Sequence, residues 1–241
     1  GYIWIGTDNG LYRYDGSEFT LFSLDGDEDA TKYSINCIYL TSDEKLYVGT
    51  DNYGLYMYDN GTFQRVSEMY NLGVSTINAM YEDDNKNLWI AASSGIFRLS
   101  SDGAEALADD VVSGLSVGNI SGHGDYVYAI ANNDILITVD PERHVSITNK
   151  SEYRVDDINS LYVDENGNRY YGSAGYSILK IGTDGKNEII NTGSLHGINK
   201  IYSDGDNIWA LADDGVGYIS SKGNVTAIGG LSFNESMSDM I

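Results

Sequence analysis

Residues 2–7, YIWIGT, form a short apolar strand pattern that decides the fold, because it returns along the whole chain. Clear copies are LYVGT at 46–50 and LWIAA at 88–92, and weaker copies follow at 127–130, 169–173 and 208–212. Each copy carries one aromatic anchor, and the six anchors are Trp4, Tyr47, Trp89, Tyr128, Tyr170 and Trp209. Successive anchors lie 39 to 43 residues apart. A period of about 40 residues that is built from strands is typical of β-propellers.

The sequence pattern of each repeat predicts four strands in a fixed order. The first strand carries Ile-Asn, as at 35–36, 77–78, 158–159 and 198–199, and an acidic turn leads from it to the anchor strand. The third strand begins at a glycine, as at Gly10, Gly54 and Gly95. Asp-Gly or Asn-Gly then leads to an outer strand, as at 15–16 and 60–61, and such pairs between alternating strands favour tight hairpins.

We therefore predict an all-β fold, a closed β-propeller of six blades, each of four antiparallel strands, in one domain over residues 1–241. The first blade combines residues 1–23 with a C-terminal strand at 236–241, which closes the ring and hides two strand edges. The further blades begin near residues 34, 75, 116, 156 and 197. An open fragment, or part of a seven-bladed ring, is the alternative.

Composition excludes several classes of protein. The chain holds 14 Lys and Arg against 36 Asp and Glu, and the net charge of −22 disfavours binding to nucleic acid or to anionic membranes. One Cys and three dispersed His argue against a disulfide framework and a zinc site. The acidic turns at 83–87 and 164–168 offer oxygen ligands for calcium, but neither completes a calcium loop, so we predict ordinary hairpins, no metal and no cofactor.

The repeat resembles that of the two-component regulator propeller family. The resemblance is carried by residues 4–15, WIGTDNGLYRYD, by 46–59 and by 83–98. The later repeats depart from the pattern, since Gly-Thr is lost after Tyr128 and Trp209, and Tyr170 replaces Trp. Such repeats form the extracytoplasmic sensor part of bacterial hybrid histidine kinases and of some membrane-bound diguanylate cyclases. The resemblance implies a sensor domain of a longer, membrane-anchored receptor, which places this chain in the periplasm or at the cell surface.

Polar and aromatic residues near the expected loop face are the candidate ligand-binding residues. The asparagines of the Ile-Asn pairs recur once per repeat and offer amide donors and acceptors near a central channel, although they can equally satisfy backbone groups of the repeat itself. Loop aromatics can stack on a sugar ring, and His196 directly precedes a first strand. The candidates are Tyr33, Asn36, Tyr53, Asn78, Asn159, Tyr176, His196 and Asn199.

These observations predict a non-catalytic sensor domain of a bacterial receptor that binds a small polar ligand such as a saccharide at the loop face or channel mouth. Its other partners are the neighbouring domains of the receptor chain and a second copy in a receptor dimer. A docking scaffold is the first alternative, with acidic pairs at 109–110, 156–157 and 213–214 facing a basic partner. A propeller lyase or hydrolase is the second, although no catalytic motif is present.

Overall fold

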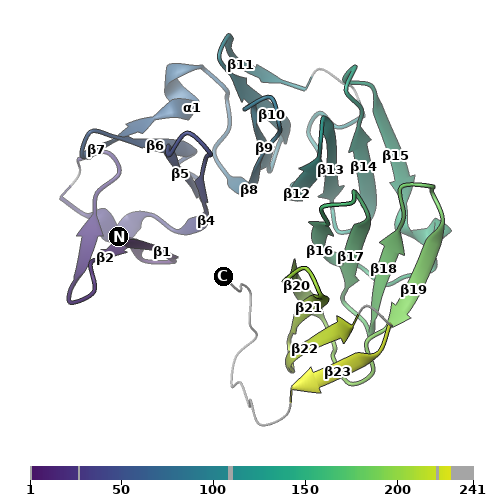
Figure 1. Cartoon of the computed structure of the whole chain (residues 1–241). Coiled ribbons are helices and arrows are strands. Elements are labelled where there is room, and N and C mark those ends of the chain that lie inside the picture. The colour runs from purple at the N-terminus through teal and green to yellow at the C-terminus, as the bar shows by residue number, and fades with distance from the viewer. Residues whose placement is uncertain (1, 27, 108–110, 221–222, 229–241) are drawn as a thin grey trace. The chain divides into compact units, whose positions relative to one another are not determined.

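The computed structural model describes residues 2–26, 28–107, 111–220 and 223–228 (Figure 1). The chain forms two compact units, residues 1–120 and 121–241. Among the described residues, the first unit carries sheets of three and four strands that follow one another along the sequence. These are β1 (Ile3–Thr7), β2 (Gly10–Tyr14) and β3 (Phe19–Phe22); then β4 (Ile35–Leu40), β5 (Leu46–Thr50), β6 (Leu55–Asp59) and β7 (Thr62–Arg65); then β8 (Ile77–Glu82), β9 (Leu88–Ala92), β10 (Gly95–Ser100) and β11 (Gly103–Ala106).

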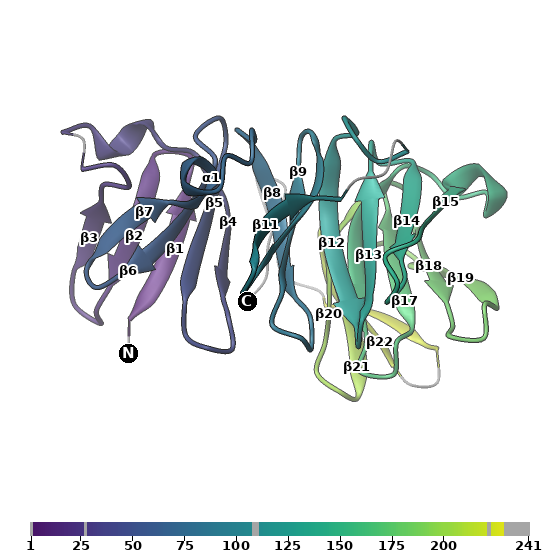
Figure 2. The same ribbon diagram turned by 90° about the horizontal axis from the view of Figure 1, so that it is seen from above.

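The second unit repeats the same four-stranded plan. Its first sheet begins with β12 (Val117–His123), which crosses the boundary between the units, and continues with β13 (Tyr126–Ala131), β14 (Ile135–Val139) and β15 (Val145–Asn149). The others are β16 (Ile158–Val163), β17 (Arg169–Ser173), β18 (Ser177–Ile181) and β19 (Asn187–Asn191); then β20 (Ile198–Ser203), β21 (Asn207–Ala212), β22 (Gly215–Ser220) and β23 (Val225–Ile228). Figure 2 shows β12 and β13 of this unit lying side by side as neighbouring strands.

Within every sheet each strand pairs with the strand before it, so the chain runs as successive hairpins. This confirms the predicted all-β repeat of antiparallel strands. The described part of the chain adds little helix: the 3-10 turns η1 (Ala30–Lys32) and η2 (Lys150–Glu152) and the short helix α1 (Val66–Met69). None of these helices has the length or the apolar character that crossing a membrane requires. The predicted closing strand at 236–241 lies outside the described residues.

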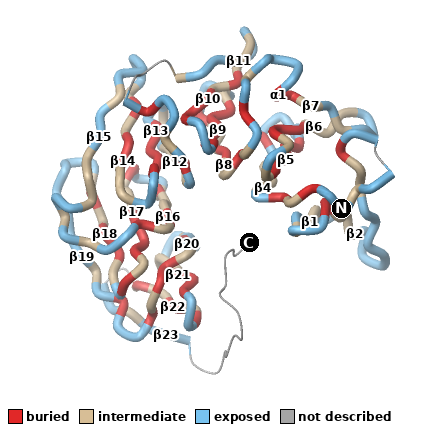
Figure 3. The backbone as a smooth tube through the Cα atoms, turned by 180° about the vertical axis from the view of Figure 1, so that it is seen from behind, coloured by how far each residue is buried: buried red, intermediate tan, exposed pale blue. Residues whose placement is uncertain are grey.

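The core of each unit lies along the anchor strands. Every residue of β5 and of β9 is buried, whereas the outer strands β3 and β23 are mostly exposed (Figure 3). The anchor Trp89 is buried, and its indole N–H donates to a carboxylate oxygen of Asp83 at 2.8 Å. The same carboxylate accepts the backbone N–H groups of Asn85 and Asn87 at 3.0 and 2.9 Å. The acidic turn thus uses its carboxylate inside the hairpin and ties it to the anchor.

Each Ile-Asn pair lies at a β-bulge at the start of a first strand. In the β4–β5 pair, Ile35 faces Thr50 and Cys37 faces Gly49, so that Asn36 is the extra residue. The equivalent register shift makes Asn78, Asn159 and Asn199 the extra residues of their strands. A bulge releases one residue from cross-strand pairing. The asparagine amide is therefore available to a neighbouring sheet.

A glycine on the anchor strand lets the next first strand approach closely. A Cβ on Gly49 would lie 2.6 Å from Cys37 Sγ and 2.7 Å from Ile77 Cγ2. Gly172 and Gly6 meet the same kind of neighbour, Ile198 and Ile35, with their Cγ2 atoms at 2.6 Å from the place of a Cβ. Real Cβ atoms do not come this close to a carbon, so these three positions favour glycine where one sheet packs on the next.

Candidate functional site

A cluster of polar and aromatic side chains in the second unit is the candidate ligand site. It joins the β17–β18 loop, the residues before β20 and the β21–β22 turn. The ring of Tyr176, which is 52% exposed, lies 4.8 Å from the ring of His196, centroid to centroid, at a tilt of 59°. Asn199 Nδ2 donates to Asp213 Oδ1 at 2.7 Å, and Nδ1 of His196 lies 3.8 Å from Asp213 Oδ2. Two of the eight predicted residues, His196 and Asn199, therefore lie at the Asp213 carboxylate, and a third, Tyr176, contacts the His196 ring.

Backbone hydrogen bonds fix the three segments against one another. The N–H of Gly197 donates to the Gly175 carbonyl at 3.0 Å, and the N–H of Asp213 donates to the His196 carbonyl at 2.9 Å. The His196 N–H donates in turn to a carboxylate oxygen of Asp214 at 2.9 Å. Gly197 adopts a positive φ of 65°, a conformation that glycine reaches without strain. The loops are therefore held by their main chains, which leaves the Tyr176 ring and the imidazole facing solvent.

This cluster, here called the Tyr176 cluster (Tyr176, His196, Asn199, Asp213 and Asp214), suits a polar ring-shaped ligand. An exposed aromatic face can stack on a sugar ring, while carboxylate, amide and imidazole groups offer both donors and acceptors to hydroxyl groups. The two carboxylates outnumber the single histidine, so the cluster disfavours an anionic ligand. A neutral polyol or saccharide matches this chemistry better.

The asparagines of the Ile-Asn pairs have three kinds of partner. Asn36 Nδ2 donates to the Ile77 carbonyl at 3.1 Å, and Asn78 Nδ2 donates to the Val117 carbonyl at 2.7 Å. In both cases the amide bridges from one sheet to the first strand of the next. Asn159 instead accepts a bond at its Oδ1 from Asn133 at 3.3 Å. The amides of Asn36 and Asn78 thus serve the packing of the repeat, while Asn199 belongs to the Tyr176 cluster.

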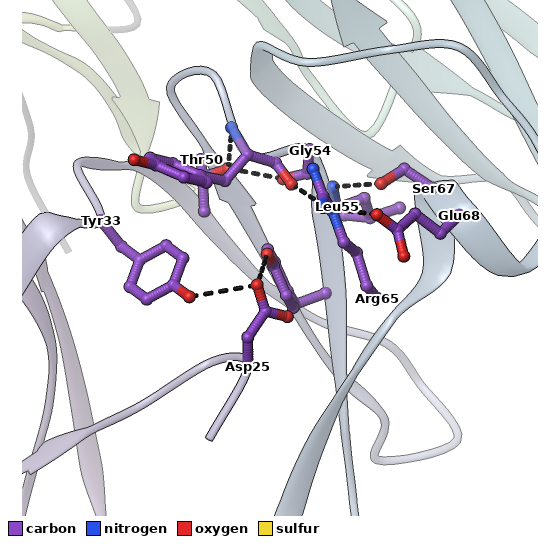
Figure 4. A network of polar contacts seen from close by, with 10 residues as sticks. Asp25, Tyr33, Thr50, Gly54, Leu55, Arg65, Ser67 and Glu68 are labelled. Atoms are coloured by element: carbon purple, nitrogen blue, oxygen red, sulfur yellow. Dashed lines mark hydrogen bonds and ion pairs between the residues drawn. The ribbon is translucent and has the colours of Figure 1, made fainter. Parts of the chain in front are cut away.

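Tyr33 and Tyr53 lie together in the first unit, in a different setting. Their rings meet edge to face at 4.9 Å, but Tyr33 is fully buried. Its hydroxyl and that of Tyr56 both donate to Asp25 Oδ2, at 3.1 and 2.9 Å (Figure 4). Burial, together with the hydrogen bond to Asp25, raises the pKa of Tyr56. Stacking on a ligand needs an exposed ring, so Tyr33 is unsuited to the role that its sequence position suggested.

Arg65 holds the main chain of Tyr53 in place. Its Nε donates to the Tyr53 carbonyl at 2.8 Å, and its guanidinium pairs with Glu68 at 2.6 Å (Figure 4). Tyr53 is itself half-buried. The inserted tyrosine therefore lies in a β5–β6 loop that is held by the last residue of β7.

Sequence reasoning missed the central role of two acidic residues. Asp213 and Asp214 stood out only as an acidic pair for a basic partner, as did Asp156 and Asp157. In the structure Asp213 connects Asn199 with His196, and Asp157 pairs with Lys150. The signal available in the sequence was the position of 213–214 directly after an anchor strand. The third acidic pair, at 109–110, lies outside the described residues.

Comparison with known proteins bears on the repeat and on the fold. Residues 71–94, which include β8 and β9, match the family model of the two component regulator propeller. This confirms the resemblance that the third repeat carries. No curated protein shows significant sequence similarity to the chain.

Several solved structures share the fold. The extracellular domain of BT4673 from B. thetaiotaomicron, described as a hybrid two component system, is 21% identical, with a TM-score of 0.78 over 99% of this chain and 36% of that one. The extracellular domain of BT3049 from the same organism is 18% identical, with a TM-score of 0.79 over 95% of this chain and 32% of that one. The chain thus spans about a third of the length of these two domains.

A more distant match is virginiamycin B lyase from Staphylococcus aureus, 14% identical, with a TM-score of 0.70 over 95% of this chain and 80% of that one. At these identities the likeness shows the fold alone. The fold is therefore all-β and propeller-like, made of repeated antiparallel sheets.

Proposed function

We propose that the chain is a non-catalytic sensor domain of an extracytoplasmic bacterial receptor, which binds a saccharide or another small polyol at the Tyr176 cluster. The observation that carries this proposal is the half-exposed Tyr176 ring packed on His196, beside the Asn199–Asp213 pair. The extracellular domains of BT4673 and BT3049 support the receptor setting, because they match nearly all of this chain in fold. Binding would shift the population of two receptor arrangements, and so pass the signal to neighbouring domains or to a receptor dimer.

A saccharide panel tests the binding site directly. Titration calorimetry with mono- and oligosaccharides should yield at least one ligand, and Tyr176→Ala should weaken its binding about tenfold, since stacking supplies much of the contact. Tyr202→Ala is the matched control, because Tyr202 is 54% exposed in the same unit and lies at the far end of β20 from His196. Equal weakening by both variants, or no binding by any saccharide, would contradict the proposed ligand.

The receptor setting has its own test. The gene that encodes the chain should also encode a membrane anchor and a kinase or cyclase output domain. A chain that is secreted alone would contradict the sensor proposal, whatever it binds.

Virginiamycin B lyase has a similar fold, so the alternative that this chain is an enzyme should also be tested. Hydrolysis or β-elimination activity that disappears in a His196→Ala variant would favour an enzyme. Retention of saccharide binding without turnover would favour the sensor.

We also propose that residues 236–241 supply the fourth strand of the first sheet. Their spacing from the first strand at 198–203 supports this, and among the described residues β1 is hydrogen-bonded on the β2 side only. Deletion of residues 236–241 should speed hydrogen exchange at the amides of β1. Unchanged exchange there would contradict a closed ring.

A further inference from the structure

Two grooves occupy the same place in the repeat, one in each unit. The groove of the second unit has a volume of about 500 Å³ and lies between the sheets β16–β19 and β20–β23. Its walls include Tyr170, which pairs with Lys180 across the strands, and Ile208, which pairs with Ile219. In the first unit a groove of about 530 Å³ is lined by the cross-strand pairs Tyr47–Met57 and Leu88–Leu99. These pairs correspond in the repeat to Tyr170–Lys180 and Ile208–Ile219. Both volumes fall within the range of small-molecule sites.

Both grooves lie beside an anchor that is tyrosine. Trp89 and Trp209, by contrast, fill their positions with an indole that is hydrogen-bonded to the preceding acidic turn, at 2.8 Å to Asp83 and 2.6 Å to Asp204. A phenol ring is smaller than an indole and leaves more space between adjacent sheets. The two grooves therefore share one position in the repeat and a tyrosine anchor.

The two grooves differ in the net charge of their lining residues. The groove of the first unit is balanced, with Lys45 and Lys86 against Asp43 and Glu82, and Lys45 pairs with Asp43 at 2.8 Å. The groove of the second unit is acidic. Within the described part of the chain, its lining holds one cation, Lys180, against the carboxylates of Asp164, Glu165, Glu188 and Asp206.

The carboxylates at the rim of this acidic groove have no ion-pair partner among the residues that the structure describes, and Glu188 lies opposite Lys180 in the β18–β19 register. Asp164 is used in its own turn, where it accepts the backbone N–H of Asn168 at 2.8 Å. The carboxylates of Glu165, Glu188 and Asp206 form no ion pair with any residue that the structure describes. Three exposed carboxylates thus surround an opening whose walls are tyrosine and isoleucine.

The acidic groove already holds one ammonium group against an aromatic wall. Lys180 Nζ lies 5.5 Å from the centre of the Tyr170 ring, within the range of a cation–π contact. Nearby, Tyr162 continues the aromatic wall, and its ring centre lies 6.2 Å from that of Tyr170. The local chemistry therefore favours a positive charge beside apolar surface.

From this arrangement we infer that the acidic groove binds a small organic ammonium ion with an aromatic or alkyl body. The body would lie against Tyr162, Tyr170 and Ile208, and the ammonium group would face Glu165, Glu188 and Asp206. The acidic groove lies at the end of the β16–β17 pair away from Tyr176. This second site is therefore independent of the saccharide site and does not rest on the proposed function.

The test compares 2-phenylethylamine with 2-phenylethanol, which has the same ring and no charge at neutral pH. Calorimetry and NMR shift mapping on the whole chain should show amine binding in the millimolar range or tighter, with the largest shifts in β17, β21 and β22. The alcohol should bind at least about tenfold more weakly, because it cannot pair with the carboxylates. No amine binding, or equal binding of the two compounds, would overturn the inference.

Two variants sharpen the test. The triple variant Glu165→Gln, Glu188→Gln, Asp206→Asn should weaken amine binding about tenfold. The matched control Glu18→Gln, Glu142→Gln, Asp102→Asn removes the same charge from exposed hairpins elsewhere and should change binding less than about twofold. Equal weakening by both would show a general charge effect and overturn the inference.

Lys180→Met should strengthen amine binding, whereas the triple variant should weaken it. The substitution places in the acidic groove the residue that the balanced groove has at the corresponding position, Met57. It removes the internal cation from the Tyr170 ring, so amine binding should become about threefold tighter or more. A variant that merely damaged the fold would weaken binding instead. Weakened binding by a Lys180→Met protein with an unchanged melting temperature would also contradict the inference.

Discussion

Replacement of Gly49 by alanine tests whether the glycine of the repeat is a packing requirement. The new Cβ would lie 2.6 Å from Cys37 Sγ and 2.7 and 2.9 Å from Cγ2 and Cβ of Ile77. Ile77 is fully buried and β-branched, so its side chain has little freedom to turn away. Overpacking of this kind costs about 1–3 kcal/mol, and the stiffer unfolded chain returns about 0.4–1 kcal/mol. The free energy of unfolding should therefore fall by about 1–2 kcal/mol.

Gly118→Ala is the matched control. Gly118 also lies in a first strand of the first unit, but no atom comes within 4 Å of the place of its Cβ, and its φ is not positive. This substitution should leave stability unchanged or raise it by up to about 1 kcal/mol. Urea denaturation followed by circular dichroism and by tryptophan fluorescence measures both variants and shows whether the transitions coincide.

A second substitution in the same protein identifies the contact. In the third repeat the pair that corresponds to Cys37–Gly49 is Ala79–Ala91. Adding Cys37→Ala to Gly49→Ala copies this pair, so the double variant should lose less stability than the sum of the single variants, by about 0.5 kcal/mol or more. Additive losses, or a Gly49→Ala protein as stable as Gly118→Ala, would refute the reasoning.

Other contacts make further predictions. Asn78→Ala should cost about 0.5–1.5 kcal/mol through loss of the bond to the Val117 carbonyl, and unchanged urea stability would count against that bond. Hydrogen bonds from Trp209 and from nearby backbone lower the pKa of Asp204 from 3.8 to about 2. Because the folded pKa lies below the unfolded value, this carboxylate stabilises the fold above about pH 4, and the contribution is lost as the pH falls toward 2. Trp209→Phe should raise this pKa, and an NMR titration that shows no rise would contradict the assignment. Asp25→Ala leaves two tyrosine hydroxyls without their acceptor and should cost about 1–3 kcal/mol, whereas a melting temperature equal to that of the native chain would show the network to be dispensable.

The hairpins and the repeat were predictable from sequence because their signals are local. Asn60-Gly61 marks a turn on its own, since both residues adopt positive φ there, 48° and 94°. The recurrence of the aromatic anchor then predicts the repeat, and it does not depend on which residues are in contact. Both features depend on residues that lie a few positions apart in the chain.

The roles of the asparagines could not be predicted in the same way. The partner of Asn36 is the main-chain carbonyl of Ile77, and a carbonyl oxygen has no signature in the sequence. Tyr33 was predicted as a loop aromatic, and it is buried, with its ring against Tyr53 and Tyr56 and its hydroxyl bonded to Asp25. Asp25 accepts hydrogen bonds from both tyrosine hydroxyls, and it lies 8 and 31 residues away from them in the chain. Only the fold brings these groups together.

The asparagine bridges have a consequence for how such a protein can change over generations. Asn36 and Asn78 each donate a hydrogen bond to a main-chain carbonyl of the following sheet, at Ile77 and at Val117. Every amino acid has a main-chain carbonyl oxygen, so this hydrogen bond does not depend on the side chain of the acceptor residue. A duplicated repeat can therefore join its neighbours at once, and its surface can then diverge freely. Another donor can also reach that oxygen: in the fifth repeat, whose sequence departs from the first three, the hydroxyl of Ser160 donates to the Ile198 carbonyl at 2.9 Å.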